Sequence, residues 1–173
     1  MRKCVMAAVA FASALGATDA SALELSSPDI TPGATLAPAQ VYSECGGENV
    51  PPALSWSGAP AATKSFALTV FDPDAQGGWW HWIVYDIPAA ASSLAHGTVS
   101  PAGAHLGRND FGLKTYDGAC PPPGSGTHHY LFKIWALATP SLPSDMDAKG
   151  ETIGPYLEAH ALASATLTAT YER

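Results

Sequence analysis

The chain has little positive charge. Of its 173 residues only 8 are lysine or arginine, against 15 aspartates and glutamates, and the formal net charge is −7. Such a balance provides no basic surface to attract a nucleic acid or an anionic membrane, so it argues against both as partners. The negative net charge is still compatible with the binding of a small anion in one local pocket.

The chain also lacks an apolar run long enough to cross a bilayer, which takes about 20 residues. The uncharged stretch from Val5 to Leu15 is shorter than that. Arg2-Lys3 precede it and Ala20-Ser21-Ala22 follow it, an order typical of a secretory signal peptide. We therefore expect a signal peptide over residues 1–22, one mature domain over 23–173 without a transmembrane anchor, and a periplasmic or secreted location.

Cysteine is scarce as well, at three residues. Cys4 precedes the apolar stretch, so only Cys45 and Cys120 remain in the predicted mature chain. An even count in an oxidising compartment favours a disulfide between them, and two buried free thiols are the alternative. There is no Cys-x-x-Cys sequence, so thiol redox catalysis has no support.

Several segments rich in β-branched and aromatic residues lie between glycine and proline turns, with no helix-length pattern separating the central ones. This spacing predicts a mainly all-β fold, an antiparallel Greek-key sandwich. The expected strands are Ala53–Trp56, Lys64–Phe71, Trp80–Ile87 and Tyr130–Ala138.

The last third of the chain has a different pattern. Residues 155–163 predict a helix, because Pro155 suits a first helical turn. The alternating segment Ser164–Tyr171 predicts a closing strand, and residues 145–152 a second short helix.

Polar and titratable residues gather where the expected strands begin or end. Asp72-Pro73-Asp74 follows one strand, His81 lies among tryptophans, and His128-His129-Tyr130 opens another strand. Each has a structural explanation by itself. Asp-Pro-Asp commonly forms a turn, and a histidine flanked by tryptophans is commonly a core residue.

Because side chains alternate along a strand, His81 should share a face with Trp79, with Trp80 and Trp82 on the other face.

The order of these motifs is more specific than any one of them. Asp-Pro-Asp-Ala and Trp-His-Trp are followed by Asn109-Asp-Phe-Gly, Tyr116-x-Gly-x-Cys-Pro-Pro and Gly126-x-His-x-Tyr. This order resembles the phosphatidylethanolamine-binding protein family, in its bacterial Raf-kinase-inhibitor-like branch, from about Leu25 to Tyr171. The resemblance implies an antiparallel β-sandwich with a C-terminal helical element and a cis Asp72–Pro73 peptide bond.

The resemblance also implies one pocket for phosphate-like or carboxylate anions. Its ligand-binding residues would be Asp72, Asp74, His81, His128 and Tyr130. The chain departs from the family pattern at Gln76, Ala119 and His129, where the family has proline, proline and arginine. Because the histidines hold an anion best when protonated, binding should strengthen as the pH falls through about 6.5. His129→Arg should strengthen binding at neutral pH, because arginine stays charged there.

The same residues suggest a function on chemical grounds. Imidazole and phenol groups can donate hydrogen bonds to an anion, and the carboxylates can orient the histidines. We expect an exported anion-binding protein, not an enzyme and without a cofactor, that inhibits or regulates a partner such as a protease. A hydrolase using Asp, His and Tyr is the alternative. A zinc site at Asp74, His81 and His128 is a third reading, although no metal-binding motif supports it.

Overall fold

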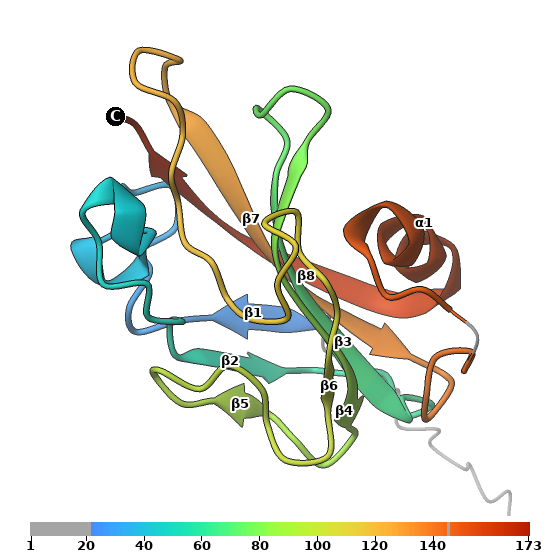
Figure 1. Ribbon diagram of the computed structural model, residues 1–173. Helices are drawn as coiled ribbons and strands as arrows, with labels where there is room; N and C mark the ends of the chain where they lie inside the picture. The colour runs from blue at the N-terminus through green and yellow to red at the C-terminus, as the bar shows by residue number, and fades with distance from the viewer. Residues whose placement is uncertain (1–21, 145) are drawn as a thin grey trace, which may run out of the picture.

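The computed structural model describes residues 22–144 and 146–173, so the predicted signal peptide lies outside the described residues except for Ala22. In this part of the chain, eight strands, one α-helix and two 3-10 turns follow one another (Figure 1). The strands are β1 Glu24–Ser26, β2 Leu54–Ser57, β3 Ser65–Asp72, β4 Trp79–Pro88, β5 Ser93–Leu94, β6 His105–Leu106, β7 His128–Leu137 and β8 Ala161–Tyr171; the helix is α1 Gly150–His160, and the 3-10 turns are Pro38–Gln40 and Ser43–Cys45. No helix among these residues is long and apolar enough to cross a bilayer.

The strands form two antiparallel sheets. The larger has the order β6-β4-β3-β7-β8 and the smaller the order β1-β2-β5. The four predicted strands in residues 53–138 all occur, with ends shifted by one or two residues. The predicted fold class, a mainly β protein built from antiparallel sheets, is therefore confirmed.

The central strand β3 is buried on both of its faces, which explains its nearly continuous apolar sequence. Phe66, Leu68 and Val70 join the core between the two sheets. Ala67, between them in sequence, joins a second core that includes Ile153 of α1. The larger sheet is thus covered by the smaller sheet on one side and by α1 on the other (Figure 1).

Helix α1 begins five residues earlier than the sequence predicted. Its glycines explain the difference, because a Cβ atom at Gly150 or Gly154 would lie 2.1 or 2.6 Å from the ring of Trp80. Contact with Trp80 stabilises a turn before Pro155, which therefore lies inside the helix. The separate short helix expected over residues 145–152 is wrong: residues 146–149 are not helical, residues 150–152 form the first turn of α1, and Asp145 lies outside the described residues.

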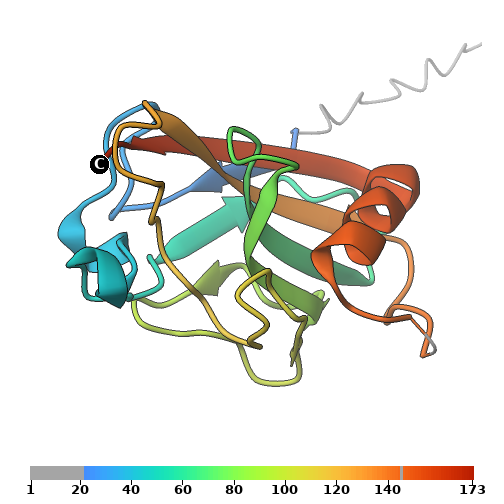
Figure 2. The same cartoon turned by 45° about the horizontal axis from the view of Figure 1, so that its top comes forward.

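The C-terminal end of the chain lies beside two loops that are distant in sequence (Figure 2). Gly124 donates its backbone N–H to the Arg173 carbonyl at 2.9 Å, and Thr127 Oγ1 donates to Glu172 Oε2 at 2.6 Å. Tyr42, next to the second 3-10 turn, donates its N–H to the Ala119 carbonyl at 3.0 Å. These contacts fix the loop of residues 118–127 at the end of the larger sheet.

Candidate functional site

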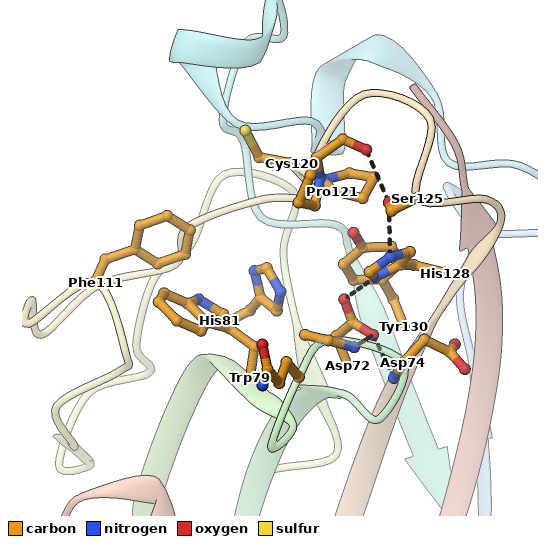
Figure 3. A pocket seen from close by; sticks show the side chains of 13 residues that line it. Asp72, Asp74, Trp79, His81, Phe111, Cys120, Pro121, Ser125, His128 and Tyr130 are labelled. Atoms are coloured by element: carbon orange, nitrogen blue, oxygen red, sulfur yellow. Dashed lines mark hydrogen bonds and ion pairs between the residues drawn. The ribbon is translucent and has the colours of Figure 1, made fainter.

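A pocket of about 580 Å³ opens at this end of the larger sheet, where β3 ends and β4 and β7 begin (Figure 3). All five residues predicted to bind a ligand line it: Asp72, Asp74, His81, His128 and Tyr130. Among the other lining residues are Trp79, Phe111, Pro121, Pro122 and Ser125. Residues from β3, β4, β7 and the loops after β6 thus meet in one cavity.

Asp72 and His128 form a buried pair across neighbouring strands. Asp72 Oδ2 lies 2.7 Å from His128 Nδ1, and the two side chains are only 4% and 5% exposed. Asp72 Oδ1 accepts the backbone N–H groups of Asp74 at 2.8 Å and Ala75 at 3.2 Å. Both carboxylate oxygens are therefore engaged, and Asp72 shapes the turn as well as orienting the histidine. The expected cis Asp72–Pro73 bond is wrong, because the described residues contain no cis peptide.

His81 lies at an irregularity in β4. Val70 pairs with Trp82 and Phe71 with Trp80, so His81 is an extra residue with no partner on β3. This β-bulge changes the predicted alternation of side chains. Trp79 and His81 line the pocket and Trp80 packs on the α1 side, as expected, but Trp82 lies in the core between the sheets. The expectation that Trp80 and Trp82 share a face was wrong.

The His81 ring is held by backbone and buried in aromatic surroundings. Its Nδ1 lies 2.8 Å from the Asp117 carbonyl oxygen, which only accepts, so Nδ1 carries a proton. Its ring packs edge-on against Tyr130, with ring centres 5.1 Å apart. Burial lowers the pKa of His81, against a smaller opposing effect of the Asp117 carbonyl. A neutral ring with an unprotonated Nε2 follows at neutral pH.

A buried polar network fixes the segment that holds His81. Asn109 Nδ2 contacts the His81 carbonyl at 3.2 Å and Asp117 Oδ2 at 2.6 Å. Asn49 Oδ1 accepts the Gly118 N–H at 2.7 Å. A Cβ at Gly118 would lie 2.1 Å from the Gln40 carbonyl oxygen, so this close approach requires glycine. Asn109 opens one of the sequence motifs, but its supporting role in the pocket, like that of Asn49, could not be predicted from the sequence.

Asp74 and His129 form a second pair, at the surface. Asp74 Oδ2 accepts the His129 backbone N–H at 2.7 Å and lies 2.8 Å from its Nδ1. These hydrogen bonds lower the pKa of Asp74. His129 is exposed and alternates with the buried His128 and Tyr130 along β7, so its side chain does not line the pocket. The His129 side chain therefore meets the pocket through Asp74, so we expect a smaller effect of its charge on anion binding than the sequence suggested.

Two donors in the pocket have no hydrogen-bond partner among the described residues. They are the Tyr130 hydroxyl and the indole Nε1 of Trp79, and both atoms are buried. Burial raises the pKa of Tyr130, the Asp72 carboxylate adds to this effect, and the Cys120 backbone opposes it. The phenol therefore stays protonated. Leaving a buried donor unpaired costs about 1–3 kcal/mol, so a ligand that accepts these hydrogen bonds would recover that energy.

Cys45 and Cys120 are joined by a disulfide in the structure, with Cα atoms 5.7 Å apart and a separation of 75 positions in sequence. The bond connects the second 3-10 turn to the loop that borders the pocket, and Cys120 itself lines the cavity. Within residues 22–144 and 146–173, no three His, Cys, Asp or Glu side chains gather so as to hold a metal ion.

The sequence model of the phosphatidylethanolamine-binding proteins matches residues 26–172, which is nearly all of the described chain. The chain belongs to the phosphatidylethanolamine-binding protein family. It is 46% identical to the UPF0098 protein YbcL of Escherichia coli over 163 residues, which cover 88% of this chain and 89% of YbcL. It is 40% identical to a Mycobacterium tuberculosis protein that carries the name lipoprotein LppC, over 88% of this chain and 74% of that one.

Solved structures of the phosphatidylethanolamine-binding protein family share the fold. The crystal structure of E. coli YbcL superposes with a TM-score of 0.83 at 44% identity, over 88% of this chain and 99% of that one. A carboxypeptidase Y inhibitor, crystallised with its cognate proteinase, gives a TM-score of 0.54 at 19% identity over 88% of this chain and 83% of that one. At this identity the likeness extends to the fold alone.

Proposed function

We propose that the pocket binds a small oxyanion, such as a phosphate or carboxylate head group. The observation that carries the proposal is the pair of unpartnered buried donors, Tyr130 Oη and Trp79 Nε1. An oxyanion accepts hydrogen bonds and donates none when fully ionised, so it complements two donors better than a neutral ligand does.

The acidic residues of the pocket do not oppose this proposal. Asp72 is engaged by His128 and by two backbone N–H groups, and Asp74 by His129. A carboxylate whose oxygens accept such hydrogen bonds has its charge offset locally. His81 adds a group that can gain a proton when an anion arrives, because its Nε2 is free of the bond that holds Nδ1.

We also propose that the protein works outside the cytoplasm. The predicted signal peptide supports work outside the cytoplasm, and the name of the mycobacterial relative also refers to an exported class of protein. A protein target such as a protease is a finer proposal, suggested by the inhibitor that shares this fold. In that case a carboxylate of the target would occupy the pocket.

Calorimetric titration with sulfate, whose charge is constant near neutral pH, tests the pocket directly. Tyr130→Phe removes one donor, and we expect weaker binding by roughly tenfold or more, since hydrogen bonds to charged groups contribute about 1.5–3 kcal/mol. Tyr85→Phe is the matched control, because Tyr85 lies outside the pocket. Equal affinity of wild type and both variants would reject the proposal, as would no binding at millimolar sulfate.

A further inference from the structure

We propose that Ser125, His128 and Asp72 form a nucleophile, base and carboxylate chain that hydrolyses carboxylic esters through an acyl group on Ser125. Ser125 Oγ lies 3.0 Å from His128 Nε2, and His128 Nδ1 lies 2.7 Å from Asp72 Oδ2 (Figure 3). These contacts match the geometry by which a histidine activates a serine hydroxyl in unrelated folds. The sequence offered no nucleophile, because Ser125 has no Gly-x-Ser-x-Gly context.

The proton positions follow from the hydrogen-bond partners. An ionised carboxylate only accepts, so the proton between Asp72 and His128 is on Nδ1. In the neutral imidazole, Nε2 then carries the lone pair and faces the Ser125 hydroxyl. The Pro122 carbonyl, 2.8 Å from Ser125 Oγ, is a second acceptor for the same proton. When the hydroxyl donates to Nε2, His128 is in position to act as a general base.

The local backbone presents Ser125 at the surface and keeps its partners buried. Gly124 and Gly126, on either side of it, have φ angles of 75° and 88°, a left-handed conformation that favours glycine. Ser125 is exposed, whereas His128 and Asp72 are buried. The hydrogen bonds of residues 124 and 127 to the C-terminal residues hold this loop. An accessible hydroxyl thus lies above a sheltered base.

The same pocket contains groups suited to the rest of the reaction. The protonated Tyr130 hydroxyl and Trp79 Nε1 are buried donors without an acceptor among the described residues. We assign to them the stabilisation of the negative oxygen of a tetrahedral intermediate. Trp79, Phe111 and Pro121 provide an apolar wall for an acyl group. The expected substrate is an uncharged ester with a small acyl group, so this inference does not depend on the proposed anion.

Besides the ester, water is the only reactant that this reaction needs. Ser125 Oγ bonds to the carbonyl carbon of the ester as its proton moves to His128 Nε2. The bond from that carbon to the alcohol oxygen breaks, and His128 returns the proton to the departing alcohol. Water then gives a proton to His128 and attacks the acyl carbon, and Ser125 leaves with the proton. The products are a carboxylic acid and an alcohol, and Asp72 acts as a positioning residue.

Two measurements test the proposal on the mature protein. A fluorophosphonate probe, which phosphonylates activated serines with loss of fluoride, should label Ser125, as located by peptide mass spectrometry. p-Nitrophenyl butyrate hydrolysis should fall about 10²–10⁴-fold in His128→Ala, the usual contribution of a general base. Ser125→Ala should lose both the label and this hydrolysis, whereas Ser93→Ala, at an exposed serine of β5, should keep both.

Further readouts separate catalysis from folding. Asp72→Asn keeps a side-chain oxygen for the turn but removes the charge, so we expect kcat to fall while KM stays within about twofold. Thermal melting of each variant shows whether it is folded, and Ser125→Ala is at an exposed position that should tolerate the change. No label on Ser125 in the folded wild type, or equal hydrolysis by wild type and Ser125→Ala, would overturn the inference. Sulfate calorimetry on the same samples tests anion binding separately.

Discussion

Protonation of His81 should control the affinity of the pocket for an anion. Burial lowers the pKa of this histidine, and its Nδ1 is already committed to the Asp117 carbonyl. An anion beside the ring favours the charged form, so binding raises the pKa of His81 and takes up a proton. Affinity should therefore strengthen as the pH falls, and it should level off only below the ordinary histidine value of about 6.5, where His81 of the free protein is also protonated.

The size of the effect follows from proton linkage. Between the pKa values of the free and the ligand-bound forms, uptake of one proton changes the affinity about tenfold for each pH unit, or about 1.4 kcal/mol. Sulfate is the suitable probe, because its charge does not change over this range. Calorimetry in two buffers with different ionisation enthalpies gives the number of protons bound with the ligand.

His81→Gln removes the titrating ring while leaving a side chain that can donate a hydrogen bond. We expect its sulfate affinity to lose most of the pH dependence. His160→Gln changes an exposed histidine at the end of α1 and should retain it. Proton uptake that is the same in wild type and His81→Gln would refute the reasoning.

The structure supports three further predictions. Thiol titration of the denatured, unreduced mature protein should detect neither Cys45 nor Cys120, and reduction should lower the free energy of unfolding by about 4 kcal/mol, as expected for a loop of this length. Gly154→Ala should destabilise the protein in urea denaturation by about 1 kcal/mol, since crowding against Trp80 exceeds the gain in helix propensity, and a stabilised variant would contradict this contact. His129→Arg should change sulfate affinity less than twofold in calorimetry, because residue 129 lies outside the pocket; a tenfold gain would show that its charge reaches the ligand.

Much of the candidate site could be predicted from sequence, because its residues belong to short motifs at strand ends. Asp72, Asp74, His81, His128 and Tyr130 all line one cavity, as the motif order indicated. Their contacts could not be predicted in the same way. The pairing of Asp72 with His128 spans 56 residues, and local pattern carries no information on which oxygen meets which nitrogen.

The sequence by itself determined the strand pattern of this protein, because an apolar segment between turn residues has few other ways to bury its side chains. It did not determine the bulge at His81, which depends on how β4 pairs with β3 and which moves Trp82 into the core between the sheets. The tertiary structure also decided that Ser125 contacts His128 and that His129 turns away from the pocket. Each of these outcomes depends on the register of strands or the path of a loop, and both are set by contacts between residues distant in sequence.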